Sequence, residues 1–262
     1  YSCKSLRGKH GIILLGIINV LLFGAPGLIV WGIQLGWTPF FAAGVINGIG
    51  HWFGYRNFEP GNDASTNMFP WGILIAGEEL HNNHHAYGTA AKLSVKWYEF
   101  DIGWMYITIL SFFRLAKVRR LAPKTTVIKK DIVDLDTVKS VFSDRLKVLA
   151  AYGTSVIKPV FKQERDTTID SNTHKALARG VCKLIIRDTF LVDEEGQAQI
   201  DKALLACTPL KIVCDYRAKL VAIWSQRTAS NDELVVALEG WCKDAEATGI
   251  SALQAFVPYV KG

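Results

Sequence analysis

The chain has few cysteines, and none of them stands in a metal-binding or disulfide pattern. Five occur in 262 residues; they are scattered and form no C-x-x-C pair. This usage argues against a disulfide scaffold and a zinc knuckle, and it favours a reduced, cytosol-facing polar part. There is no short signal-peptide core with a cleavage site, and no clear internal repeat. Because the chain begins at Tyr1 and not with Met, we expect it to be part of a longer protein.

Charge is almost absent from residues 11 to 57, whereas residues 115 to 262 carry most of the charged side chains. The uncharged run Gly11–Ile33 is long enough to cross roughly 30 Å of hydrocarbon, with Pro26 expected to kink it. A turn over Gln34–Pro39 and a second apolar run, Phe40–Phe53, complete a predicted helical hairpin. Lys4, Arg7 and Lys9 before the hairpin and Arg56 after it predict that both ends are cytoplasmic. A buried hairpin in a soluble protein is the alternative.

The rest of the chain is predicted to be helical as well, which makes the fold class all-α. After a polar loop, a helix is expected over Gly72–His85, and an interfacial or buried helix over Trp97–Leu115. We divide the chain into a membrane and metal-binding portion, residues 1–120, and a cytosolic helical extension of unknown role, residues 121–262. Amphipathic helices are expected there over Ile132–Ala151, Asn172–Asp188, Gln197–Ala206, Pro209–Gln226 and Asp232–Thr248, with Thr208-Pro209 as a start signal and a capping box from Ser230 to Glu233.

Half of the six histidines fall in one run, His81-Asn82-Asn83-His84-His85. On a helix, the histidines of this H-x-x-H-H pattern lie within an arc of roughly 100°, so three imidazoles point into one small volume. Imidazole is the commonest protein ligand for iron, copper, zinc and nickel. A His-rich surface turn is the plainer alternative. We expect a metal site.

Further candidates lie near this run. Asn47 and His51 share a helix face at the end of the second apolar run, and a coordinating residue there is often functional. His51 is therefore a fourth candidate metal ligand, and Asn47 an outer contact through water. Glu78 is expected to hydrogen-bond to the second ring nitrogen of a ligand histidine, with Glu79 as the alternative. An all-histidine set argues against calcium and magnesium and leaves iron, zinc and copper open.

Two motifs together resemble the membrane fatty acid desaturases, most closely the stearoyl-CoA (delta-9) class in its bacterial form. The first is H-N-N-H-H preceded by Gly77-Glu78. The second is N-x-x-x-H running into Phe53-Gly54-Tyr55-Arg56. The resemblance extends from about residue 4 to residue 124. It includes Gly8-Lys9-His10-Gly11, Trp97-Tyr98-Glu99-Phe100-Asp101 and Leu115-Ala116-Lys117-Val118-Arg119-Arg120.

The resemblance implies a di-iron centre that uses O₂ to introduce a cis double bond, expected at the delta-9 position, into a saturated acyl chain. His81, His84 and His85 match the third histidine box, His51 matches a further iron ligand, and Asn47 matches a residue that contacts metal through water. The first two boxes are absent, since His10 is the only histidine before His51. We therefore expect a C-terminal fragment that is inactive alone, lacking an upstream pair of membrane helices.

The implied partners are an acyl-CoA or acyl-lipid substrate, O₂, membrane lipid and a small electron-transfer protein, at a bacterial inner membrane with the site on its cytoplasmic side. A basic cluster offers a docking surface for anionic headgroups, an acyl carrier or an acidic redox partner, although a solvated charge run explains it equally. Its members are Lys117, Arg119, Arg120, Lys124, Lys129 and Lys130. Nucleic acid fits poorly, because no reading motif is present. A related lipid or alkane hydroxylase and a non-catalytic membrane-anchored metal-binding or adaptor protein remain alternatives.

Overall fold

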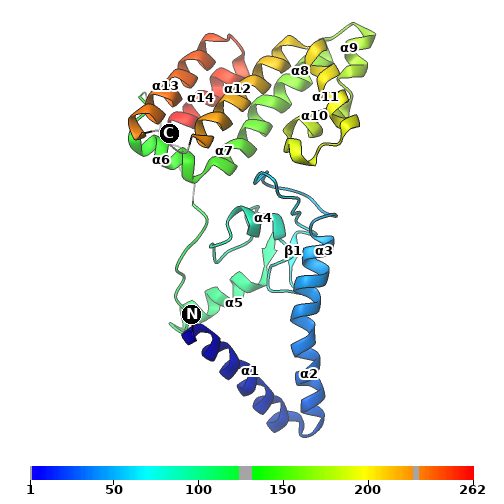
Figure 1. Ribbon diagram of the computed structural model, residues 1–262, viewed down its shortest axis with the longest axis vertical. Helices are drawn as coiled ribbons and strands as arrows, with labels where there is room; N and C mark the ends of the chain where they lie inside the picture. The colour runs from blue at the N-terminus through cyan, green and yellow to red at the C-terminus, as the bar shows by residue number, and fades with distance from the viewer. Residues whose placement is uncertain (1, 124–131, 227–229) are drawn as a thin grey trace. The chain divides into compact units, whose positions relative to one another are not determined.

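The computed structural model describes residues 2–123, 132–226 and 230–262, which are mostly helical (Figure 1). The expected all-α class is confirmed. Contacts divide the chain into two units. The N-terminal unit comprises Tyr1–Tyr55, Ser65–His84 and Ala91–Arg119; the C-terminal unit comprises Arg56–Ala64, His85–Ala90 and Arg120–Gly262.

A helical hairpin opens the N-terminal unit, as expected. α1 (Ser2–Phe23) packs on α2 (Pro26–Pro39), and their packing includes a hydrogen bond of 3.0 Å from the Asn19 amide to the Gln34 side-chain oxygen. A Cβ at Gly27 would lie 2.2 Å from the carbonyl oxygen of Asn19, so only glycine allows this close approach. The bonded amides therefore belong to the interface between the two helices.

The hairpin turns at Gly24–Ala25, and the expectation of a turn over Gln34–Pro39 was wrong. Gly24 has φ +65°, the left-handed conformation that commonly ends a helix. Pro26 does not kink the first helix but stands in the first turn of α2, where its missing N–H costs no hydrogen bond. Proline marks two possible turns in this sequence, at Pro26 and at Pro39. The turn forms at the first, where Gly24 ends the preceding helix.

The second helix is the longer one. It continues past Pro39 as η1, a π-helix over Phe40–Ile46, and as α3 (Asn47–Ile49). The helical run Pro26–Ile49, 24 residues, is long and apolar enough to cross a membrane. Among the described residues the other apolar helices, His10–Phe23 and Ile102–Phe112, are shorter. Because proline lacks the N–H that the regular ladder needs, the π-helical stretch directly after Pro39 has a local cause.

The region between the hairpin and α5 is largely irregular. β1 (Trp71–Gly72) pairs in parallel with β2 (Phe100–Asp101), and the histidine run lies on the short helix α4 (His81–Ala86). The helix expected over Gly72–His85 was therefore too long. Ala76 and Gly77 have φ of 53° and 100°, which breaks any helix before α4.

The next apolar segment forms the helix α5 (Ile102–Phe112), shorter than the expected Trp97–Leu115. Asp101 is its N-cap, and its carboxylate accepts a hydrogen bond of 2.8 Å from the Trp104 N–H. A capping carboxylate fixes where the helix begins, which the apolar run itself does not reveal.

The C-terminal unit packs its helices around one apolar core. Tyr152 is fully buried there, and its hydroxyl donates a hydrogen bond of 2.7 Å to the Val213 carbonyl. The helices are α6 (Leu135–Ser143), α7 (Arg145–Tyr152), the π-helix η2 (Gly153–Ile157), α8 (Lys158–Thr167), α9 (Ser171–Ala176), α10 (Arg179–Ile186), the 3₁₀ turn η3 (Thr189–Leu191), α11 (Glu194–Ala206), α12 (Thr208–Ser225), α13 (Asn231–Ala247) and α14 (Ser251–Lys261).

The sequence pattern predicts this unit only in part. The capping box of Ser230 and Glu233 is present, and α11, α12 and α13 begin and end within a few residues of the expected bounds. Two expected helices are each divided in two, at Asp144 and around Leu177, and α8 and α14 were not predicted. The N-cap of α12 is Cys207 and not Thr208, while Pro209 stands in its first turn as expected.

Candidate metal centre

The end of the long helix is fixed to the loop that comes after it. The Thr66 backbone N–H donates to the Gly50 carbonyl at 2.6 Å. The Thr66 hydroxyl lies 2.9 Å from the same oxygen and 2.7 Å from that of Phe53. Thr66 is buried, so these bonds form in a place with little competition from water. They hold the turn that carries His51.

His51 and His81 meet although thirty residues separate them. Their Nε2 atoms lie 3.1 Å apart, and the ring planes meet at 79°. His81 is buried and His51 is half-buried. The helix end and α4 thus bring two imidazole nitrogens to one point.

His85 completes a cluster of three. One ring nitrogen each from His51, His81 and His85 lies within 4.8 Å of the other two. His81 and His85 are one helical turn apart on α4, which explains why both face the same point. The H-x-x-H-H run thus contributes two of the three clustered donors, and His84 is not among them.

His84 lies beside this cluster. Its ring stacks on that of His81 with centroids 6.1 Å apart. Glu78, expected to contact a ligand histidine, has its carboxylate 3.9 Å from the Nδ1 atom of His84. Glu79 instead accepts hydrogen bonds from the backbone N–H groups of Leu74 and Ile75, so it shapes the loop.

Asp63 is a residue that sequence reasoning missed. Its carboxylate lies 3.1 Å from the Nδ1 atom of His85. A carboxylate at the second ring nitrogen fixes the tautomer and orientation of a histidine ligand. Asp63 lies in a polar loop 22 positions before His85, and nothing local in the sequence links the two.

Asn47 is the first residue of α3 and stands one turn before His51. Its side chain is exposed. The helix ends at Ile49, so His51 lies in the turn that follows it, and the expectation that it shares a helix face with Asn47 was wrong. Its contact with metal through water stays a prediction.

α4 is anchored by buried amides and one buried carboxylate. The Asn83 amide donates to the Leu93 carbonyl and to the Glu99 carboxylate, both at 2.9 Å, and the Asn67 amide donates to the Asn83 side-chain oxygen at 3.1 Å. The Asn82 amide donates to the Ser65 carbonyl at 3.2 Å. The two asparagines inside the histidine run therefore position the helix.

Glu99 and Asp101 organise the loop around this anchor. Glu99 also accepts a hydrogen bond of 2.8 Å from the Tyr55 hydroxyl; burial and the nearby Glu99 carboxylate raise the pKa of Tyr55, which keeps it a donor. The Asp101 carboxylate accepts a hydrogen bond of 2.7 Å from the Leu93 N–H. A Cβ at Gly77 would lie only 2.6 Å from the same carboxylate. In the sequence, the only indication that Glu99 and Asp101 organise this loop is that they interrupt an apolar run.

The basic cluster is described only in part. Lys117, Arg119 and Arg120 are exposed. Lys124, Lys129 and Lys130 lie outside the described residues. The exposed members are accessible to an acidic partner, and their role stays a prediction.

The donor set fits a transition metal. Three imidazoles converge, at least one with a carboxylate at its second nitrogen, which is how proteins commonly hold iron, zinc or copper. Ligand type alone does not select among these metals. The surrounding hydrogen bonds fix the backbone segments that carry these histidines.

Comparison with known proteins supports this interpretation of the histidine region. The chain is 36% identical over 114 residues to an sn-1 stearoyl-lipid 9-desaturase of Anabaena variabilis, covering 43% of this chain and 41% of that protein. It is 39% identical over 119 residues to an sn-1 stearoyl-lipid 9-desaturase of a Synechocystis species, covering 45% and 37%. It is also 35% identical over 97 residues to an acyl-CoA 5-desaturase of Anemone leveillei, covering 36% and 30%.

Part of this chain is therefore similar to fatty acid desaturases. The chain spans about two fifths of the length of the desaturases from the two bacteria. No family model matches it, and no solved structure matches it. The matches cover less than half of this chain, so at least half of its residues lie outside each of them.

Proposed function

We propose that this chain supplies one side of the metal centre of an O₂-dependent di-iron fatty acyl desaturase. The convergence of His51, His81 and His85 carries the proposal, because it joins two motifs that the resemblance assigns to one centre. The substrate is a saturated acyl chain and the product carries a cis double bond at the delta-9 position. Two relatives named as 9-desaturases support that position, whereas the carrier, lipid or CoA, differs among relatives.

The histidines at positions 51, 81, 84 and 85 would hold iron. Iron would supply an oxidant derived from O₂, which removal of hydrogen from an unactivated C–H bond requires. Asp63 and Glu78 lie at the Nδ1 atoms of His85 and His84 and orient those rings. Asn47 contacts the metal through water. The remaining ligands come from outside this chain.

The apolar helix Pro26–Ile49 supports a position of this centre at the edge of a membrane, since His51 stands two residues beyond the helix. We assign the site and the C-terminal extension, residues 121–262, to the cytoplasmic side of a bacterial inner membrane. The exposed Lys117, Arg119 and Arg120 then offer a docking surface to a small acidic electron-transfer protein.

Metal binding is the first test, because it needs only this chain. The purified chain is titrated with Co²⁺, whose visible absorption reports nitrogen ligands, and then with Fe²⁺ without oxygen. We expect the H51A and H81A variants to lose binding, while H174A, a matched control on the exposed surface of α9, binds as the parent does. Equal binding by H81A and the parent would refute the proposed centre.

Desaturation is tested in a chimera. The matching region of the Synechocystis relative is replaced by that of this chain, and cellular fatty acids are analysed by mass spectrometry. A loss of two mass units supports desaturation, and a gain of sixteen indicates the related hydroxylase. A chimera that binds iron and leaves saturated chains unchanged would contradict the proposed activity.

A further inference from the structure

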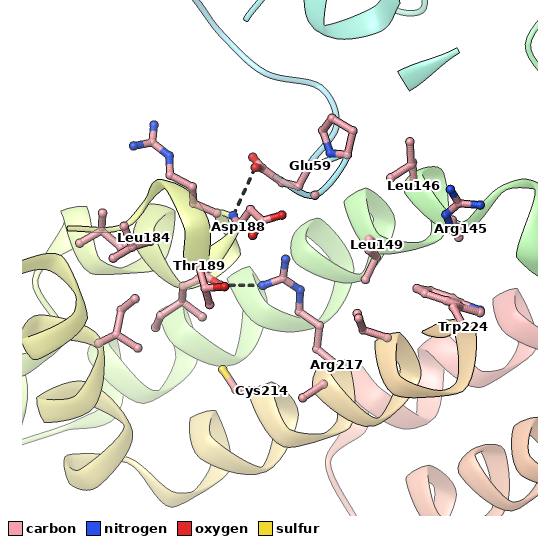
Figure 2. A pocket seen from close by; sticks show the side chains of 18 of the residues that line it. Glu59, Arg145, Leu146, Leu149, Leu184, Asp188, Thr189, Cys214, Arg217 and Trp224 are labelled. Atoms are coloured by element: carbon pink, nitrogen blue, oxygen red, sulfur yellow. Dashed lines mark hydrogen bonds between the residues drawn. The ribbon is translucent and has the colours of Figure 1, made fainter. Parts of the chain in front are cut away.

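A cavity of about 820 Å³ lies within the C-terminal unit (Figure 2). Its size falls within the range of small-molecule sites, roughly 300–1,000 Å³. Seven leucine, isoleucine and valine side chains from α7, α10, α11 and α12 line it, together with eight polar or charged side chains. None of the candidate ligand histidines lines it, so a ligand of this cavity would be independent of the proposed desaturase function.

One face of α12 lines the cavity. Cys214, Ala218, Val221 and Ser225 all line it, and they lie on one face of that helix. From Cys214 to Ser225 the helix rises about 16 Å. A wall of this length and apolar character matches an extended alkyl chain better than a compact ring system.

One cation is fixed inside this apolar wall. The terminal nitrogens of Arg217 donate hydrogen bonds of 2.8 Å each to the carbonyls of Ile185 and Ile186, at the C-terminal end of α10. Figure 2 draws one of the two. Carbonyls at a helix C-terminus favour a cation, so the guanidinium is held in place. A guanidinium has five N–H donors, and these two bonds leave three for another acceptor.

The charges around the cavity favour an anion. Arg145, Arg187 and Arg217 line it, against the carboxylates of Glu59 and Asp188. The Glu59 carboxylate forms an ion pair of 3.0 Å with Arg56, which does not line the cavity. It also accepts a hydrogen bond of 3.2 Å from the backbone N–H of Asp188. Three guanidinium groups thus line the cavity against two carboxylates, which leaves an excess of positive charge.

We propose that this cavity binds the anion of a long-chain fatty acid, with its carboxylate at Arg217 and its alkyl chain along α12. The binding is non-covalent. Burial of the alkyl chain supplies most of the affinity, and the fixed guanidinium selects a carboxylate over a neutral or cationic head group.

The test uses the whole chain, held in solution by an amphipathic polymer, so that no free detergent competes for the cavity. The probe is stearic acid with a photoreactive diazirine at mid-chain, and labelled peptides are mapped by mass spectrometry. We expect labels on α7, α11 and α12. Unlabelled stearate should compete, whereas methyl stearate and stearylamine should compete at least tenfold more weakly.

Two variants and one control test where the ligand binds. A218W fills the cavity and should reduce labelling about tenfold or more, since the chain loses its apolar contact. A222W places the same side chain on α12 at an exposed position outside the lining, and should label as the parent does. R217Q should weaken labelling about tenfold and allow methyl stearate to compete as well as stearate.

Three results would overturn the proposal. One is labelling confined to α1 and α2, which reports partition onto the apolar hairpin. Another is equal labelling of A218W and the parent. The third is equal competition by stearylamine. R217Q alone is not decisive because Arg217 also caps α10, and helix content and thermal midpoint are therefore compared for every variant.

Discussion

Glu99 is the residue whose neutralisation tests most directly how the histidine helix is held. Its side chain is 7% exposed, although a carboxylate is costly to bury. Four donors satisfy it: the Asn83 amide at 2.9 Å, the N–H groups of Val95 at 2.6 Å and Lys96 at 2.9 Å, and the Tyr55 hydroxyl at 2.8 Å. The variant E99Q keeps the shape of the side chain and removes the charge.

The loss of stability in E99Q follows from the number of hydrogen-bond acceptors that the side chain keeps. Oε2 accepts the three N–H donors and Oε1 accepts the Tyr55 hydroxyl. A glutamine oxygen in the Oε2 position accepts at most two of the three N–H groups, while the NH₂ group in the Oε1 position can donate to the Tyr55 hydroxyl, so one buried donor loses its acceptor. An unsatisfied buried donor costs about 1–3 kcal/mol. Because Asn83 lies between His81 and His84 on α4, we expect metal binding to weaken before the chain unfolds as a whole.

Two measurements on the same preparation separate these effects. Titration with Co²⁺ gives the metal affinity, and denaturant unfolding of the metal-free chain gives the stability. We expect E99Q to bind Co²⁺ at least tenfold more weakly, with a smaller change in the unfolding of the C-terminal unit. D244N, an exposed change on α13, should alter neither. If E99Q binds metal and unfolds as the parent does, the account of the anchored helix is wrong.

Three further outcomes are expected. D63N should weaken metal affinity about 10–100-fold without changing the unfolding midpoint, since it removes the carboxylate 3.1 Å from the Nδ1 atom of His85; calorimetric titration checks this. G27A should lower the thermal midpoint of the detergent-solubilised chain, because its Cβ would meet a backbone carbonyl of α1 at 2.2 Å, whereas G32A, with open space, should not. Burial raises the pKa of the Cys242 thiol to about 12, above its ordinary value near 9. The stability that the protonated thiol contributes is therefore present below pH 9 and lost as pH rises toward 12. Alkylation at pH 8.5, followed by mass spectrometry, should modify Cys242 far more slowly in the folded chain than in denaturant.

Local patterns in the sequence predict the features that need only local geometry. The spacing of His81 and His85 places both on one face of a helix, and the capping box of Ser230 and Glu233 forms as expected. Each depends on residues within one turn of each other, where helical geometry determines proximity. The meeting of His51 with His81 went beyond such patterns, and it was anticipated from the resemblance and from both segments ending near one membrane surface.

Features that depend on competition between distant groups were not predictable in this way. The turn of the hairpin was misplaced because Pro26 and Pro39 both mark breaks, and only the left-handed backbone of Gly24 decides between them. The helix bearing the histidines was drawn too long because acidic side chains bond to the backbone before it. Glu79 accepts from the N–H groups of Leu74 and Ile75, which gives that segment hydrogen-bond partners outside a helix.

The segments next to the histidines show why a boundary drawn on composition is insufficient. Residues 56–64 and 85–90 are grouped by their contacts with the C-terminal unit, not with the hairpin that precedes them. In the second segment the Lys147 ammonium lies 5.5 Å from the ring centre of Tyr87, and burial raises the pKa of that tyrosine. A chain cut after residue 120 would leave this ring without that cover. Because His85 and Asp63 belong to these two segments, a boundary after residue 120 separates a candidate ligand and its carboxylate neighbour from the helices with which their contacts group them.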